Sequence, residues 1–141
     1  MMNVLLSIKP EYVAEMLKGN KKYEFRRLIF KNKKINRIYI YATSPIGKIV
    51  GSFAAGKIIE GSPAELWRKC KSTAGISKEA FFKYFRGRSR AFAIQITALE
   101  HFSEPLDPYS LLDDFTPPQS FCYLPSSVPE LDSHDKRLTD F

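Results

Sequence analysis

The chain has 141 residues and a mass of 16.2 kDa, a length that suits one domain with a buried core. Hydrophobic residues make up 44% and aromatic residues 13%, which excludes wholesale disorder. The net charge of +7 is unevenly distributed along the chain, because residues 1–101 carry +13 and residues 102–141 carry −6. A basic body with an acidic C-terminal segment suggests a polyanionic partner, although a solubilising surface would give the same balance.

Several classes of protein are not expected from the sequence. The first residues form only a short apolar run with no basic segment before it, which argues against a signal peptide or a membrane span. The two cysteines, Cys70 and Cys122, have no zinc-site spacing, and His101 and His134 are isolated. No phosphate-binding glycine loop is found. We therefore expect a cytoplasmic protein with no membrane contact, no metal site and no cofactor, and the oligomeric state stays open.

The N-terminal part predicts a strand, a helix and a second strand. Val4–Ile8 is apolar and strand-like, and Pro10 suits the first turn of a helix that ends at Gly19. Lys22–Arg27 then alternates between polar and aromatic side chains, which is typical of a strand with two different faces.

The middle of the chain predicts two strands followed by two short helices. Arg37–Ala42 is a strand that ends in a loop, and Lys48–Ile59 is a long strand whose glycines indicate a bend or bulge. Ser62-Pro63-Ala64-Glu65 is a capping box that begins a helix, and Ser77 caps another.

The last part predicts an alternating strand over Ala91–Leu99 and a final strand within Pro117–Leu124, followed by a polar tail over Pro125–Phe141. The strands look antiparallel and bend at glycines. This order favours an α+β fold built on a small curved or closed β-barrel with a few flanking helices.

The segment from Gly19 to Arg27 carries the most chemistry. In a strand, Lys22, Glu24 and Arg26 share one face, so a carboxylate would lie between cations. Crowding by neighbouring cations would lower the pKa of Lys21 and make it a possible base or nucleophile. Lys21, Glu24 and Arg26 are therefore the candidate catalytic residues. The alternative is an exposed strand face with cross-strand ion pairs.

Basic loops and aromatic side chains provide candidate nucleic-acid contacts. Arginine forks suit phosphates, and aromatic rings beside loops can stack on bases, although most of the rings would be core. Solvated turns are the alternative for the basic loops. The candidates are Lys22, Arg27, Tyr41, Thr43, Ser44, Arg86, Arg88, Arg90 and Phe121.

A family resemblance rests on an ordered set of segments. Leu5–Tyr12 followed by Gly19-x-Lys21-x-x-Glu24-x-Arg26 resembles the opening motif of the ASCH domain family, in the PUA-like superfamily. Further along, Ile40–Pro45 and the strand from Ala91 resemble a subgroup of short bacterial, archaeal and phage members. The segment Pro117-Pro118-Gln119-Ser120-Phe121 resembles the closing motif of that subgroup.

The resemblance implies a small β-barrel with helices around it and a cleft beside the Lys/Glu/Arg strand. It makes residues 1–124 an ASCH-type domain and 125–141 a tail. ASCH domains are thought to bind RNA or modified nucleosides. Some resemble nucleoside amidohydrolases, in which a threonine occupies the position of Glu24, and a few are described as ribonucleases.

Three hypotheses about function follow. The first is a module that binds RNA, another nucleic acid or a modified nucleoside in a cleft at Lys21, Glu24 and Arg26. The second is a hydrolase, either a nucleoside amidohydrolase or a ribonuclease, with Lys21 and Glu24 as catalytic groups. The third is a regulated interaction protein whose acidic tail docks on the basic face.

Overall fold

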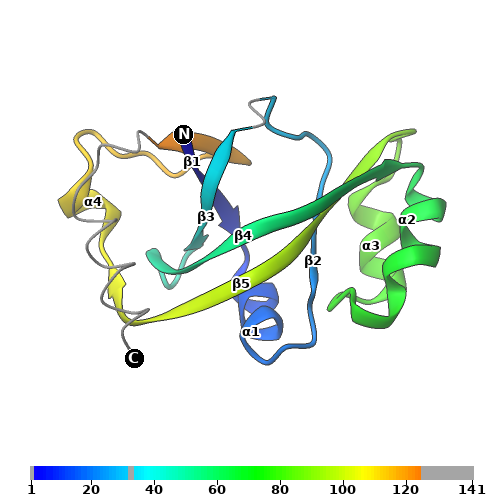
Figure 1. Ribbon diagram of the computed structural model, residues 1–141, viewed down its shortest axis with the longest axis horizontal. Helices are drawn as coiled ribbons and strands as arrows, with labels where there is room; N and C mark the ends of the chain where they lie inside the picture. Colours follow the sequence, from blue (N-terminus) through cyan, green and yellow to red (C-terminus); the bar gives the residue numbers. More distant parts are fainter. Residues whose placement is uncertain (1, 32–33, 125–141) are drawn as a thin grey trace. The chain divides into compact units, whose positions relative to one another are not determined.

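The computed structural model describes residues 2–31 and 34–124, so the predicted tail over 125–141 lies outside the described residues. Figure 1 shows the strands and helices in chain order. They are β1 (Met2–Ile8), α1 (Pro10–Leu17), β2 (Tyr23–Arg26), β3 (Ile35–Ala42), β4 (Lys48–Gly61), α2 (Pro63–Cys70), the 3₁₀ helix η1 (Lys71–Thr73), α3 (Lys78–Tyr84), β5 (Ala91–Leu106), α4 (Pro108–Leu111) and β6 (Phe121–Leu124).

The strands form a six-stranded mixed sheet in the order β2-β5-β4-β3-β1-β6. The α+β class with a few helices is therefore confirmed. The sheet is open, because β2 and β6, the strands at its two edges, are not neighbours in this order. The expectation of antiparallel strands was wrong for one pair, since β1 and β3 are parallel. A parallel pair needs a long crossover connection, and residues 9–34, which contain α1 and β2, supply it.

The chain divides into two compact units. Of the described residues, the first comprises 2–10, 34–54 and 98–124, and the second comprises 11–31 and 55–97. Strands β4 and β5 each contribute residues to both units.

In the first unit, β1 pairs with β3 on one side and with β6 on the other, so its apolar run is buried on both faces. The core contains Leu5, Tyr39, Tyr41, Ile49, Phe102, Leu106 and Leu124. The register of β3 on β4 shifts by one residue next to Gly51, where the glycine predicted a bulge. A side chain at Gly51 would collide with the backbone carbonyl of Glu100, so this position requires glycine.

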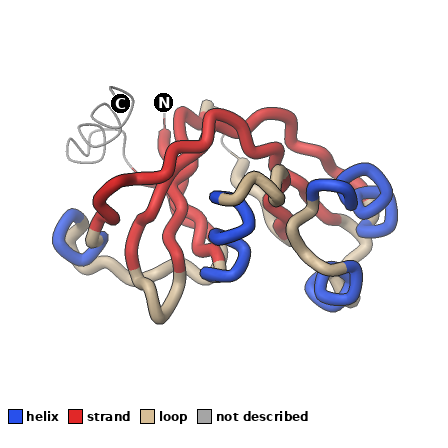
Figure 2. The backbone as a smooth tube through the Cα atoms, turned by 90° about the horizontal axis from the view of Figure 1, so that it is seen from below, coloured by secondary structure: helices blue, strands red, loops and turns tan. Residues whose placement is uncertain are grey.

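In the second unit, helices α2 and α3 pack beside β2 and the first part of β5 (Figures 1 and 2). The capping box at Ser62 is present, and the Ser77 side chain accepts the Ala80 amide as predicted. The core is strongly aromatic around Phe81, whose ring lies 4.9 Å from those of Phe25 and Phe85. Among the described residues, no helix is long and apolar enough to cross a membrane.

Candidate functional site

The loop between α1 and β2 places Lys21. Gly19 adopts φ +84°, and the backbone amides of Asn20 and Lys21 both donate to the carbonyl of Glu15. Glycine tolerates this left-handed conformation, which ends the helix and turns the chain toward β2. The backbone of Lys22 then bonds to Thr73 and to Ile96. This double anchoring fixes the start of the Lys/Glu/Arg strand.

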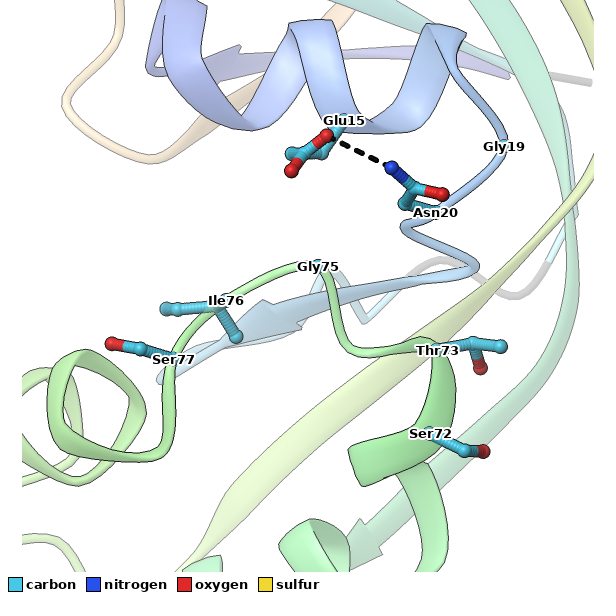
Figure 3. A pocket seen from close by; sticks show the side chains of 8 residues that line it. All are labelled: Glu15, Gly19, Asn20, Ser72, Thr73, Gly75, Ile76 and Ser77. Atoms are coloured by element: carbon cyan, nitrogen blue, oxygen red, sulfur yellow. Dashed lines mark hydrogen bonds between the residues drawn. The ribbon is translucent and has the colours of Figure 1, made fainter.

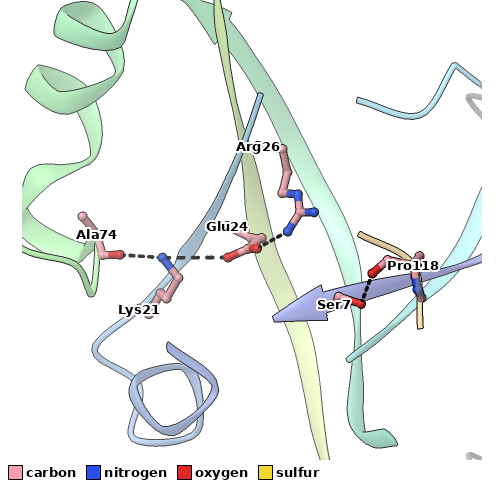
Figure 4. Close-up of polar contacts among 6 residues, drawn as sticks. All are labelled: Ser7, Lys21, Glu24, Arg26, Ala74 and Pro118. Atoms are coloured by element: carbon pink, nitrogen blue, oxygen red, sulfur yellow. Dashed lines mark hydrogen bonds and ion pairs between the residues drawn. The ribbon is translucent and has the colours of Figure 1, made fainter. Parts of the chain in front are cut away.

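Lys21 is buried, with 3% of its surface exposed. Its Nζ donates to the carbonyl oxygen of Ala74 at 2.9 Å and lies 3.9 Å from Oε1 of Glu24 (Figure 4). The ammonium also lies 4.8 Å from the ring centroid of Phe25 and 5.4 Å from that of Tyr12. Aromatic faces and a carboxylate together stabilise a cation that burial would otherwise disfavour.

Glu24 and Arg26 continue the polar row from Lys21. They lie two residues apart on β2 and therefore share a face. Nη1 of Arg26 donates to Oε2 of Glu24 at 3.0 Å, and both side chains are more than nine-tenths buried (Figure 4). Glu24 thus joins two cations, one on each carboxylate oxygen. This burial argues against an exposed face with cross-strand ion pairs, which was the alternative for this segment.

Burial lowers the pKa of Lys21, while the attraction of Glu24 acts in the opposite direction. The direction of the predicted shift agrees with the structure, but its cause differs. We expected crowding by Lys22, Arg26 and Arg27, whereas the cause is loss of water around the ammonium. Lys22 itself is exposed and does not join the buried row of Glu24 and Arg26.

Gly75 permits the close approach of residues 72–77 to Lys21. Gly75 has φ +63°, and a Cβ atom there would lie 2.7 Å from Cγ and 2.9 Å from Cα of Lys21, and closer still to its Cβ. A residue with a side chain would force these segments apart. The hydrogen bond from Lys21 to Ala74 therefore depends on glycine at the next position.

The predicted phosphate contacts of the second unit are exposed. Arg27 lies over the ring of Tyr84, with its guanidinium carbon 4.8 Å from the ring centroid. Arg86, Arg88 and Arg90 lie in the turn between α3 and β5, and Arg90 forms an ion pair with Glu60. Arg86 and Arg88 therefore lie in a solvated turn. Their exposure fits the predicted phosphate contacts and also the alternative of a solvated basic loop.

The other candidate residues belong to the first unit. Tyr41 is 4% exposed and packs edge-on against Phe115, so its ring is a core element and not the stacking surface we expected. Burial and a hydrogen bond with Tyr109 raise the pKa of Tyr41. Thr43 and the exposed Ser44 follow β3, and Phe121 is half-buried with its ring edge-on to Tyr123.

The start of the opening motif, at Ser7, meets the closing motif in the first unit. The Ser7 hydroxyl on β1 donates to the carbonyl oxygen of Pro118 at 2.6 Å (Figure 4). The Ser7 amide also donates to the carbonyl of Ser120. These bonds fix the segment before β6 against β1, and sequence reasoning did not indicate them.

Sequence reasoning also missed a polar pocket of about 500 Å³ in the second unit. It is lined by Glu15, Gly19, Asn20, Ser72, Thr73, Gly75, Ile76 and Ser77. Figure 3 shows Glu15 and Asn20 on one side and Ser72, Thr73 and Ser77 on the other. Asn20 donates to Glu15 at 3.2 Å. The sequence feature that could have indicated this pocket is the pair of small or polar residues after each helix, Gly19 and Asn20 after α1 and Ser72 and Thr73 after α2.

The charged groups are not arranged for metal binding within the described ranges. Over residues 2–31 and 34–124, no group of three or more histidine, cysteine, aspartate or glutamate side chains could hold a metal ion. Cys70 is buried and Cys122 half-buried, and burial raises the pKa of both thiols.

The chain is thus a small α+β protein with an open mixed sheet and a buried Lys/Glu/Arg row. The ASCH-like motifs of the sequence predicted this class of fold. No family model matches the chain. An "ASCH domain-containing ribonuclease" from Zymomonas mobilis subsp. mobilis is 31% identical over 126 residues, which are 85% of this chain and 82% of the relative. The chain therefore belongs to the ASCH domain family.

Solved structures agree with this assignment. A crystal structure of ASCH from Zymomonas mobilis is 28% identical, with a TM-score of 0.85 over 93% of this chain and 94% of that chain. A tyrosine-to-phenylalanine variant of that protein is 26% identical, with a TM-score of 0.84 over 93% and 96% of the two chains.

Proposed function

We propose that the chain binds RNA or a modified nucleoside through its second unit. The buried row of Lys21, Glu24 and Arg26 supports this most strongly, because a charged row in a protein interior costs free energy and needs a reason. The charge of the chain gives further support, since residues 1–37 hold 10 basic and 3 acidic residues. Membership of the ASCH domain family also favours an RNA-related role.

The roles of the residues follow from their exposure. Glu24 and Arg26 keep 7% and 8% of their side-chain surface exposed, so a ligand would reach them with one edge of a base. Glu24 accepts hydrogen bonds from an amino group of the base, and Arg26 donates to its oxygens. Exposed basic side chains then contact the phosphates: Lys22, Arg27, Arg86, Arg88 and Arg90.

The salt dependence of RNA binding tests this proposal. Affinity for single-stranded RNA is measured by fluorescence anisotropy between about 50 and 200 mM salt. Arg88→Ala should weaken binding to every sequence and flatten the slope of log affinity against log salt by about one. Arg68→Ala, which removes an exposed arginine on α2, is the matched control and should change the slope less. Wild-type binding without salt dependence would contradict the proposal.

A hydrolase is the second candidate function, because burial lowers the pKa of Lys21 and the relative is named a ribonuclease. In its neutral form Lys21 can donate one N–H to Ala74 and still accept a proton from an attacking hydroxyl group. Glu24 would relay that proton, and Arg26 would stabilise negative charge on the reacting phosphate or carbonyl.

Turnover by matched lysine variants tests the hydrolase. Wild type, Lys21→Met and the exposed-site control Lys57→Met are incubated with RNA and with acylated nucleosides, and products are separated by chromatography. Loss of product in Lys21→Met, with product retained in Lys57→Met, supports catalysis by Lys21. Unchanged turnover in Lys21→Met would exclude it, and no product with wild type would favour binding without catalysis.

A further inference from the structure

The chemistry of the polar pocket identifies the kind of group it can hold. Glu15 supplies carboxylate oxygens, Asn20 an amide, and Ser72, Thr73 and Ser77 hydroxyl groups (Figure 3). A carboxylate repels phosphate, and hydrogen-bonding groups of this density favour a polar guest over an apolar one. A neutral group rich in hydroxyls, such as a sugar, satisfies the lining.

Exposed lysines are next to the lining residues in the sequence. Lys18, Lys71 and Lys78 are exposed, and each is the immediate sequence neighbour of a residue that lines the pocket. An acidic group among hydroxyls with lysines beside it suits a sugar that carries phosphates, because the sugar meets Glu15 and the phosphates meet the lysines.

The pocket shares a segment with the Lys/Glu/Arg row. Thr73 and Gly75 line the pocket, while Ala74, which lies between them, accepts the hydrogen bond of Lys21. Asn20, which also lines the pocket, directly precedes Lys21 in the chain. The pocket and the contacts of Lys21 are therefore built from neighbouring residues of the same two segments.

We propose that the pocket is a ribose site in which Glu15 accepts a hydrogen bond from the 2′-hydroxyl and so distinguishes RNA from DNA. This rests on the proposed RNA binding. The 2′-hydroxyl is the group by which proteins tell RNA from DNA, and a site built to bind a hydroxyl rejects the analogue that lacks it. One charge-assisted hydrogen bond gives a preference of about tenfold or more.

The test compares single-stranded RNA and DNA of the same sequence as probes, with affinities measured at several salt concentrations. The proteins are wild type, Glu15→Ala and Glu11→Ala. Glu11 lies one turn earlier on α1, is exposed and does not line the pocket, so its removal changes the net charge equally. The RNA-to-DNA affinity ratio cancels that charge effect. Glu15→Gln, which can keep the contact with Asn20, provides a milder second variant.

We expect wild type and Glu11→Ala to prefer RNA about tenfold, Glu15→Ala to lose most of that preference, and Glu15→Gln to lose part of it. Equal affinity of wild type for RNA and DNA, or an unchanged ratio in Glu15→Ala, would overturn the ribose site while RNA binding stands. A wild-type protein that binds neither probe would overturn the proposed function and the ribose site with it. Thermal unfolding of each variant confirms that it is folded.

Discussion

Gly75 provides the sharpest test of how the buried row is held. Gly75→Ala places a methyl group against Cα, Cβ and Cγ of Lys21, which are atoms near the backbone that cannot turn away. The φ of +63° costs an alanine about 1–2 kcal/mol, and overpacking adds about 1–3 kcal/mol. The expected loss of unfolding free energy is about 2–5 kcal/mol, a large part of the stability of a small protein.

Gly87→Ala is the matched control for this prediction. Gly87 has φ +78°, and an added Cβ there would have no described heavy atom within 4 Å apart from those of Gly87 and its two chain neighbours. This substitution therefore carries the backbone cost of about 1–2 kcal/mol without the contact. Urea unfolding of both variants gives the two free energies. A Gly75→Ala variant no less stable than Gly87→Ala would refute the argument that close approach to Lys21 requires glycine.

Three further predictions concern the second unit. Burial lowers the pKa of Lys21 in the folded protein, so the unfolded chain binds more protons between that pKa and 10.5. The unfolding free energy of wild type minus that of Lys21→Met should therefore rise with pH in this range, by at most about 1.4 kcal/mol per pH unit. A difference that does not change with pH in urea unfolding would contradict the lowered pKa. Phe81→Ala should cost about 3–5 kcal/mol in the same assay, because its fully buried ring contacts four other rings, and a loss below that of a typical surface substitution would be inconsistent with this core. Ser62→Ala should lower the unfolding free energy by about 1 kcal/mol through loss of the capping box. An unchanged urea midpoint would contradict a stabilising role of this cap.

The elements with strong local signals could be predicted from the sequence. The capping box at Ser62, the cap at Ser77 and the glycine stop after α1 all depend on residues within a few positions of each other. The strand from Ala91 continues to Leu106, well past the predicted end at Leu99. Its second half has Pro105 and several polar residues, and pairing within a sheet outweighs the local preference of such residues.

The candidate site was harder to predict because its geometry is set by contacts distant in sequence. The motif indicated that Glu24 and Arg26 share a face, but not that this face is buried or that Lys21 bonds to Ala74, 53 positions away. The parallel pairing of β1 with β3 and the burial of Tyr41 have the same origin, since both depend on which strands become neighbours. The pocket could not be predicted from local sequence for the same reason, because its two sides come from residues 15–20 and 72–77.

The buried row has a consequence for how a ligand would act on it. Glu24 is shared between Lys21 and Arg26, and the row holds two cations and one carboxylate in its charged form. A negative or electron-rich group that approaches Arg26 competes with Glu24 for the guanidinium, which leaves more of the carboxylate for Lys21. The same approach removes water from the row and strengthens every remaining charge interaction. Ligand binding at Arg26 would therefore strengthen the attraction of Glu24 for the Lys21 ammonium, which favours the protonated form of Lys21 over the neutral form that a general base needs.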